Sequence, residues 1–222
     1  GFVKEEKQAP GGFEIETKTI NILSLANPEL PIPINSKKGG EETNSSTRLD
    51  YRWLDLRKPE KANIFKTWTA LEKGFRDYLY SANYLQVYTP SFMNSASETG
   101  AEVFEVKYFE KKAYLAQSPQ FYKQMAIASG LDRVFITGPV FRAELSFTTR
   151  HLTEFSGWDF EIGFVNSHYD IMDEEEKMIK AGFTELKNIL PELEIPAIPF
   201  PRITLKEAKD KLKAGGLDAG DD

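Results

Sequence analysis

With 222 residues, 41% of them hydrophobic, the chain is long enough for one ordinary domain and part of another, and the core it can bury excludes wholesale disorder. The formal net charge of −6 argues against nucleic-acid binding through bulk charge, although a local basic patch is still allowed. The absence of cysteine excludes disulfides and thiolate metal sites, and with only two histidines a histidine-based zinc site is not expected. The sequence has no long apolar run and no opening signal peptide, which favours a soluble, intracellular protein.

The first 47 residues contain a strand pattern and a polar connector. Residues 13–25, FEIETKTINILSL, alternate apolar and polar side chains and end before a proline-rich stretch, which predicts a strand followed by an extended segment. Because a single strand cannot fold alone, residues 1–35 are interpreted as the end of a β domain whose front is missing. Residues 36–47, SKKGGEETNSST, have the polar, Gly/Ser-rich composition of a flexible linker.

From residue 48 onward, helix patterns and strand patterns follow one another. Apolar residues in 59–84 recur mostly at spacings of three and four, which predicts an amphipathic helix with a proline in its first turn. Residues 84–92, YLQVYTPSF, predict a strand ended by proline. Residues 102–109 and 112–117 predict the two arms of a hairpin.

Residues 118–130, SPQFYKQMAIASG, carry the signals of a complete short helix. Ser118 is the expected N-cap, Pro119 the first helical residue and Gly130 the residue after the end. Further on, residues 170–190 predict a second amphipathic helix, and residues 199–216 predict a short strand followed by a helix. Antiparallel strands interleaved with helices make the expected fold class α+β.

A second hairpin is expected between residues 133–144 and 157–165, with a mostly polar loop between its arms. Strand side chains repeat every two residues, so Arg142 and Glu144 share one face of the first arm. On the second arm the expected core face carries Trp158, Phe160, Ile162 and Phe164, and the opposite face carries Asp159 and Glu161. The polar face of this hairpin is therefore the candidate binding surface.

The polar residues of this hairpin suit a phosphorylated ligand. Arg142 is permanently charged and can fork two hydrogen bonds onto a phosphate or carboxylate, and Glu144 can accept from an amino group. Arg150 adds a second cation and His151 a titratable group, so the loop suits a polyphosphate. The alternative is that Arg142 simply pairs with Glu144 or Asp159 across the strands.

The predicted helix at 118–130 carries a second polar pair. Gln120 and Lys123 lie three residues apart, hence on one helix face, near the N-terminal end that favours an anion. Together they could hold a small carboxylic acid, but a surface helix with solvated polar side chains explains the same pattern. Glu98, in a Ser/Gly-rich loop, is by itself best explained as a solvated carboxylate.

The order of these phrases resembles the class II aminoacyl-tRNA synthetases, and within them the aspartyl branch of archaeal and eukaryotic type. NYLQVYTP (83–90) is similar to the first class II motif, with its proline at Pro90. FRAE followed by TTRHLTEFSGWDFEIGF (141–164) is similar to the second, ATP-binding motif. TRLDYRWLDLR (47–57) and AYLAQSPQFYKQ (113–124) are typical of the aspartyl branch.

The resemblance implies a domain organisation. Residues 1–35 would end an anticodon-binding OB-type β-barrel, residues 36–47 would be the linker, and residues 48–222 would belong to a class II catalytic domain, an antiparallel sheet flanked by helices. The third class II motif, which supplies a further ATP-binding arginine, is absent from the sequence, so the catalytic domain is expected to be incomplete and this stretch alone to be a poor catalyst.

The resemblance also implies roles for individual residues. Arg142 would be the catalytic residue, contacting both the α-phosphate of ATP and the substrate carboxylate. The ATP site would comprise Arg142, Ala143, Glu144, Arg150, His151, Leu152 and Phe155, with the Phe155 ring stacked on adenine. The aspartate site would comprise Glu98, Ser118, Gln120, Phe121, Tyr122, Lys123 and Arg142, with Lys123 recognising the side-chain carboxylate.

The same resemblance implies ATP and Mg²⁺ as cofactors, with the magnesium ligands unknown. It also implies three partners: tRNA, aspartate and a second copy of the chain. The homodimer would form through the first motif around Pro90, in the cytoplasm and without membrane attachment. In members of this family that charge only the aspartate tRNA, a lysine occupies the position of Pro10. Because this chain has proline there, the resemblance implies that both aspartate and asparagine tRNAs are substrates. The alternatives are an asparaginyl-tRNA synthetase, a non-catalytic paralogue and a relative that makes asparagine without tRNA.

Overall fold

The computed structural model describes residues 1–35, 42–95, 102–145 and 151–217. The chain forms two compact units, Gly1–Ile64 and Phe65–Asp222, which are described separately. Within the described residues, no helix is both long enough and apolar enough to cross a membrane.

The first unit begins with a two-stranded antiparallel hairpin. Strand β1 (Phe2–Glu5) pairs with β2 (Phe13–Glu16), and a short 3₁₀ turn, Pro10–Gly12, leads into β2. The strand predicted over residues 13–25 is wrong beyond Glu16, because β1 offers four residues to pair with and a strand needs a hydrogen-bonding partner. All eight strand residues are exposed, so this hairpin has no core of its own.

Two short helices follow in the first unit. Helix α1 (Ser45–Asp50) begins inside the stretch expected to be linker, and its N-cap is Asn44, whose side chain accepts a hydrogen bond from the Thr47 amide at 2.9 Å. Helix α2 (Arg52–Asp55) follows after a single intervening residue. Its last residue, Asp55, is the organising group of this unit.

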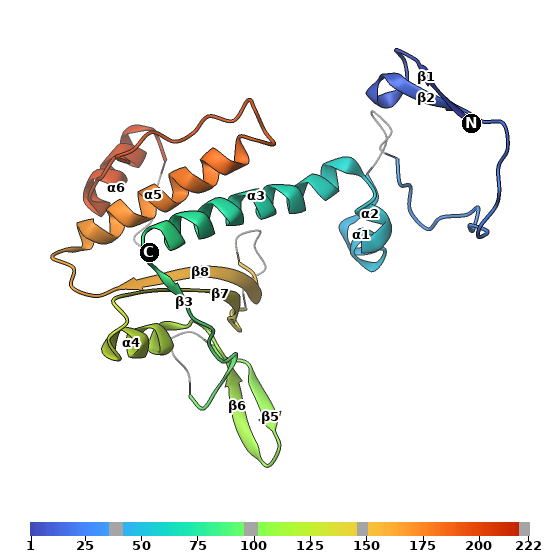
Figure 1. The fold of residues 1–222 in the computed structure, drawn as a ribbon. Helices are drawn as coiled ribbons and strands as arrows, with labels where there is room; N and C mark the ends of the chain where they lie inside the picture. The colour runs from blue at the N-terminus through green and yellow to red at the C-terminus, as the bar shows by residue number, and fades with distance from the viewer. Residues whose placement is uncertain (36–41, 96–101, 146–150, 218–222) are drawn as a thin grey trace. The chain divides into compact units, whose positions relative to one another are not determined.

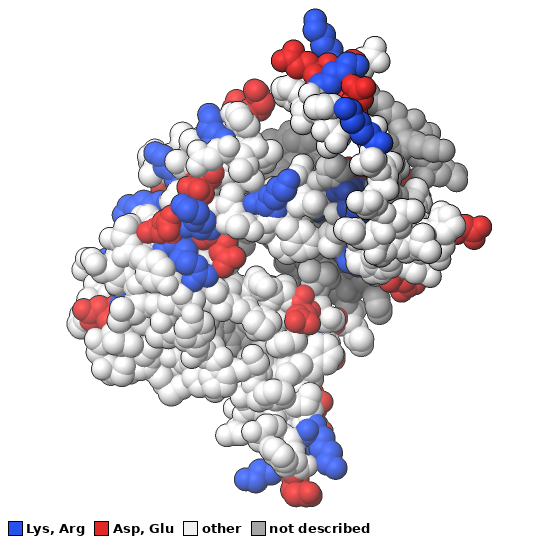
Figure 2. All heavy atoms as spheres, turned by 45° about the vertical axis from the view of Figure 1, so that its right-hand side comes forward, with Lys and Arg blue, Asp and Glu red and all other residues white. Residues whose placement is uncertain are grey.

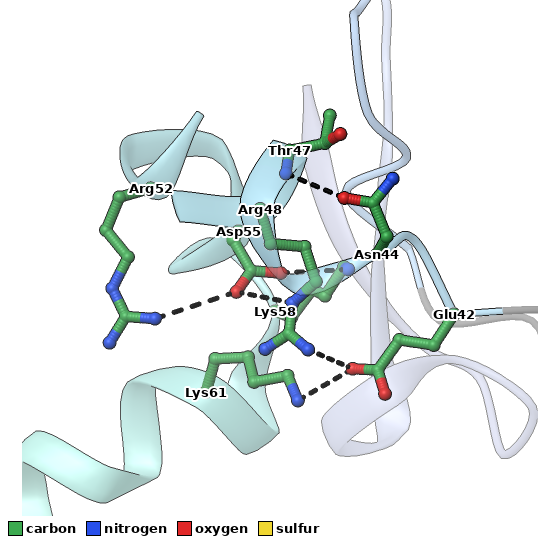
Figure 3. A network of polar contacts seen from close by, with 8 residues as sticks. All are labelled: Glu42, Asn44, Thr47, Arg48, Arg52, Asp55, Lys58 and Lys61. Carbon is green, nitrogen blue, oxygen red and sulfur yellow. Dashed lines mark hydrogen bonds and ion pairs between the residues drawn. The ribbon is translucent and has the colours of Figure 1, made fainter. Parts of the chain in front are cut away.

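Asp55 is a fully buried carboxylate surrounded by cations (Figure 3). It accepts from Arg48 Nε at 3.2 Å and from Lys58 Nζ at 3.0 Å. Glu42 in turn binds Arg48 at 2.8 Å and Lys61 at 2.9 Å, which fastens the chain before α1 to the start of the next helix. Burial disfavours the charged form of Asp55, but the hydrogen bonds and charges of Lys58 and Arg48 outweigh it and lower its pKa.

The second unit is built around a three-stranded sheet and a long helix. Helix α3 (Pro59–Ser81) has the proline start expected from the sequence, and its first residues belong to the first unit. The sheet has the order β3 (Leu85–Gln86), β7 (Arg133–Phe141) and β8 (Glu154–Ile162). Strands β7 and β8 are antiparallel as predicted, whereas β3 runs parallel to β7, so this sheet is mixed.

A smaller antiparallel sheet has the order β4 (Phe92–Met93), β6 (Lys111–Leu115) and β5 (Glu105–Tyr108). The predicted hairpin between residues 102 and 117 is confirmed as β5 and β6. In Figure 1 this hairpin projects away from the β7–β8 sheet, with its turn at the far end.

Three further helices complete the unit: α4 (Gln120–Ala128), α5 (His168–Leu186) and α6 (Leu205–Ala214). Both α5 and α6 begin with a capping box, in which the N-cap side chain and an acidic side chain three residues later bind each other's backbone amides. The short strand predicted before α6 does not form, since the described residues there include no strand.

Helices α3 and α5 lie on one side of the β7–β8 sheet and α4 lies on the other (Figure 1). The core cluster on the α3 side consists of Leu79, Tyr84, Phe135 and Met178, with Phe75, Tyr78, Ala82, Trp158, Phe160 and Ile162 packed against it. Phe135 and Trp158 stack with ring centroids 6.1 Å apart. This core fixes the sheet and leaves its α4 side available.

Glycines allow α3 and α5 to approach closely. A Cβ atom on Gly74 would lie 2.5 Å from the carbonyl oxygen of Ala181, and one on Gly182 would overlap the Phe75 ring. Neither glycine has a positive φ angle, so it is the contact distance that excludes a side chain here.

Candidate active site

A cavity of about 360 Å³ lies against the α4 side of the β7–β8 sheet. Its walls come from residues 88–91, from residues 116–119 between β6 and α4, and from both long strands, including Arg142, Phe155 and Asp159. Four segments of the chain thus meet around one space.

Strand register explains which side chains face this cavity. Directly opposed residues of an antiparallel pair share a face, and here Ile136 lies opposite Asp159 and Val140 opposite Phe155. The Arg142 amide donates to Thr153 O at 3.0 Å, which continues the pairing past the end of β7. Arg142 and Asp159 therefore share the cavity face, as the alternation predicted.

The apolar face is confirmed with one exception. Trp158, Phe160 and Ile162 pack against the core, but Phe164 is 95% exposed. Strand β8 ends at Ile162, and Phe164 has a φ angle of 58°, which breaks the alternation on which its prediction depended.

Arg142 is held in the cavity wall with hydrogen-bonding capacity to spare. Its guanidinium carbon lies 5.6 Å from the centre of the Phe155 ring, a cation–π contact. Its Nε is buried and has no hydrogen-bond partner in the described structure. The alternative of an ion pair with Glu144 or Asp159 is wrong, because neither forms within the described residues. A buried donor without a partner costs about 1–3 kcal/mol, so an acceptor such as a phosphate or carboxylate oxygen fits this position.

Lys123 is the second charged group of the site. It lies on the inner side of α4, is 8% exposed, and forms ion pairs with Asp159 and, at 3.1 Å, with Glu161. Its burial opposes the ammonium charge, but the hydrogen bonds and charges of the two carboxylates outweigh burial and raise its pKa. The alternative of a solvated surface lysine is wrong.

Lys123 has one hydrogen-bond donor left for a ligand. An ammonium group donates three hydrogen bonds, and Asp159 and Glu161 account for two in the described structure. The remaining N–H can therefore donate to a third acceptor, such as a substrate carboxylate, while both partners stay bound. The sequence did not define a role for Asp159 and Glu161. The strand alternation placed them on the correct face, but no local signal indicated that they would pair with Lys123, which precedes Asp159 by 36 residues.

Other predicted site residues lie around the start of α4. The helix begins at Gln120 with Pro119 as its N-cap residue, so the predicted cap at Ser118 is wrong. The Ser118 hydroxyl instead accepts from the Gln120 amide at 3.3 Å, and both Ser118 and Pro119 line the cavity. Phe121 is 41% exposed and Tyr122 half-buried.

The predicted ATP-site residues are only partly brought together. Glu144 is half-buried, and the neighbouring Ala143 amide donates to Glu102 O at 3.1 Å. His151 is exposed, and Leu152 lines a separate apolar hollow beside α3 instead of the cavity that Arg142 faces. Glu98 and Arg150 lie outside the described residues.

One buried polar residue of the cavity wall was not predicted. Gln117 is 1% exposed, and its side-chain amide donates to Glu102 O at 3.4 Å, the same carbonyl that accepts from Ala143. This contact joins the segment before α4 to the end of β7.

The described residues contain no cluster of three or more histidine or acidic side chains that could hold a metal ion.

Comparisons with known proteins agree with this architecture. A family described as tRNA synthetases class II (D, K and N) matches residues 44–221. An aspartate–tRNA(Asp/Asn) ligase from Aeropyrum pernix is 42% identical over 94% of this chain and 49% of its own length. An aspartate–tRNA(Asp) ligase from Thermoplasma acidophilum is 39% identical over the whole of this chain and 53% of its own length.

Among solved structures, asparaginyl-tRNA synthetase from Pyrococcus horikoshii complexed with asparaginyl-adenylate has a TM-score of 0.86 and 34% identity, covering 99% of this chain and 52% of that one. The chain thus spans about half the length of these relatives. Its fold, its motifs and the family match over residues 44–221 together show that the chain belongs to the class II tRNA synthetases of the D, K and N group.

Proposed function

We propose that the protein attaches aspartate to tRNA in two steps, through an aspartyl-adenylate. The observation that carries this proposal is the buried Lys123, held by Asp159 and Glu161 with one donor left to bind, beside the cavity that Asp159 and Arg142 both line. A carboxylate at Lys123 and a phosphate at Arg142 would place the two reactants side by side. The aspartate–tRNA ligase names of the A. pernix and T. acidophilum relatives support the choice of amino acid.

In the first step, an oxygen of the aspartate α-carboxylate attacks the α-phosphorus of ATP and pyrophosphate leaves. In the second, a hydroxyl of the terminal tRNA ribose attacks the activated carbonyl and AMP leaves. The chain contributes position and charge: Arg142 forks onto the α-phosphate and the attacking carboxylate, and Lys123 orients the side-chain carboxylate. Both groups hold their substrates without a covalent enzyme intermediate.

The cavity fits a nucleotide at Arg142. The buried Nε without a partner suits a phosphate oxygen, and the Phe155 ring beside it suits a stacked base. Mg²⁺ would bind chiefly through the substrate phosphates, with few protein ligands, as is usual for that ion.

We also propose that both aspartate and asparagine tRNAs are substrates. Pro10 opens the turn between β1 and β2, where proline can donate no backbone hydrogen bond. The same dual name, aspartate–tRNA(Asp/Asn) ligase, belongs to the A. pernix relative. Residues 1–35 would then be the end of the anticodon-binding barrel, and residues 48–222 part of the catalytic domain.

A homodimer around Pro90, in the cytoplasm, completes the proposal. Apolar side chains near Pro90 are exposed, among them Leu85 and Tyr88, as expected for a surface that another chain covers. Light scattering on the purified protein measures this directly.

The deciding experiment is aminoacylation with the protein expressed from its complete reading frame. Labelled aspartate should be attached to both tRNA transcripts, at rates within about tenfold of each other. Attachment to the aspartate tRNA alone would remove the dual specificity but leave the aspartate assignment intact. Attachment of asparagine instead of aspartate would overturn the function.

A further inference from the structure

Three aromatic rings are exposed on the β4–β6–β5 sheet, two of them, Tyr108 and Phe109, at the tip of the β5–β6 hairpin. Phe92, Tyr108 and Phe109 are 51%, 48% and 79% exposed. They contact one another in series, with ring centroids 5.8 Å apart for Phe92 and Tyr108 and 4.9 Å for Tyr108 and Phe109. The result is a row of aromatic side chains, called here the hairpin platform, that the described part of this chain leaves open to solvent.

Phe109 occupies a position that the fold alone does not favour. Its φ angle is 54°, in the left-handed region where glycine or asparagine is the usual residue. A bulky side chain there is strained, and this strain is normally tolerated where packing or function requires the side chain. Because the ring is mostly exposed, packing within the described chain does not account for it.

A cation lies on the same face as the platform. Tyr108 is opposite Lys111 in the register, and Phe92 is opposite Leu115, so Phe92, Tyr108 and Lys111 share one side of the sheet. Lys107 and Lys112 lie on the other side, where Lys112 binds Glu105 at 2.9 Å. Figure 2 shows lysine and acidic side chains together at the lower end of the molecule, where this hairpin lies.

The hairpin starts at the cavity. Strand β6 leads directly into Gln117 and Ser118 of the cavity wall. Gln117 follows Lys111 by six positions, which at about 3.3 Å per residue gives a reach of about 20 Å from the cavity to the tip. A strand of nucleic acid whose end enters the cavity can therefore pass the platform.

We propose that the hairpin platform binds RNA, with unpaired nucleotides stacked on Tyr108 and Phe109 and a phosphate held by Lys111. Exposed rings beside a lysine are the usual elements of single-strand recognition, since every base has a face to stack and every linkage carries a charge. The inference rests on the proposed function, in which tRNA is the natural RNA ligand. It adds a contact surface outside the catalytic cavity.

The test is a binding measurement on the protein from its complete reading frame. The probes are a tRNA(Asp) transcript and a fluorescein-labelled oligonucleotide of about ten nucleotides, within the usual site sizes of single-strand binders. Phe109→Gly should raise the dissociation constant for both probes by about fivefold or more, the loss expected for one stacked base. Glycine also suits the left-handed backbone, so this variant should melt at or above the wild-type temperature.

Lysine variants on the two faces serve as a matched pair. Lys111→Gln should lower the slope of log affinity against log salt by about 0.7, the value for one phosphate contact with a single strand. Lys107→Gln, on the opposite face, should leave the slope unchanged. Unchanged RNA affinity in a folded Phe109→Gly variant, or equal effects of the two lysine variants, would overturn the proposal.

Two further readouts separate this inference from its rivals. If Phe109→Gly converts a dimer into a monomer without weakening RNA binding, the platform is an interface between copies of the chain and the RNA assignment is wrong. Aspartate-dependent ATP–pyrophosphate exchange needs no tRNA and should be unchanged in the variant. If the wild-type protein shows no aspartate-dependent exchange, the proposed function itself is wrong.

Discussion

Replacing Lys123 with methionine tests the candidate aspartate site most sharply. Methionine keeps the length and helix propensity of lysine but removes its charge. In the structure this change leaves Asp159 and Glu161 facing each other without the ammonium between them. Both catalysis and folding should therefore respond.

The size of each effect follows from the environment of Lys123. A charge-assisted hydrogen bond to the substrate carboxylate contributes about 1.5–3 kcal/mol, and leaving a buried carboxylate unpaired raises the loss to about 3–5 kcal/mol. For aspartate activation this corresponds to a fall of about two to three orders of magnitude in kcat/KM. The folding penalty should be smaller, about 2–3 kcal/mol, because Asp159 and Glu161 keep 30% and 27% of their side-chain surface exposed to solvent.

The assay is aspartate-dependent ATP–pyrophosphate exchange, with thermal unfolding measured in parallel. The control is Lys73→Met on α3, where the lysine also pairs with two carboxylates, Asp77 and Glu185, but is 56% exposed. That control should change activity by less than about twofold. A second variant, Lys123→Met with Asp159→Asn, should recover stability but not activity. A folded Lys123→Met protein that activates aspartate as well as the control would refute the assignment of this site.

Three other predictions concern single positions. Arg142→Lys loses the forked contact with phosphate, so pyrophosphate exchange should fall about 10²–10³-fold while the melting temperature does not fall; near-normal exchange would exclude a role for this residue in catalysis. The pKa of Asp55 is held below its usual value of 3.8, so the stabilisation that its ionised form provides is complete above that pH and is lost as the pH falls through the lowered pKa. Unfolding curves measured between neutral and acidic pH should show this dependence in the wild type. The Asp55→Asn variant should be less stable at neutral pH and should show a weaker dependence. Gly182→Ala should cost about 1–3 kcal/mol in denaturant unfolding because the added methyl overlaps Phe75, and an unchanged midpoint would show that α3 and α5 can separate at no cost.

Local patterns in the sequence were sufficient to predict the elements that form the site. The two-residue alternation placed Arg142 and Asp159 on one face, and the spacing of apolar residues predicted α3 and α5. The alternation was misleading where a strand had already ended, as at Phe164, or had no partner, as beyond Glu16. In both places the backbone pairing, which the pattern does not report, determined the outcome.

Contacts between distant elements could not be predicted in the same way. The pairing of Lys123 with Asp159 and Glu161 depends on how α4 packs across β8, and burial of Asp55 depends on how α1, α2 and the start of α3 meet. In the sequence these residues resemble ordinary surface charges. Their partners become apparent only when the elements are placed in space.

The central claim is that the cavity selects a carboxylate side chain at Lys123. The most direct measurement is ATP–pyrophosphate exchange by the protein from its complete reading frame, with aspartate and asparagine compared at equal concentration. Exchange with aspartate and little with asparagine is the predicted result, because an amide offers no negative charge to the Lys123 ammonium. Equal exchange with both amino acids, or exchange with asparagine alone, would contradict the claim.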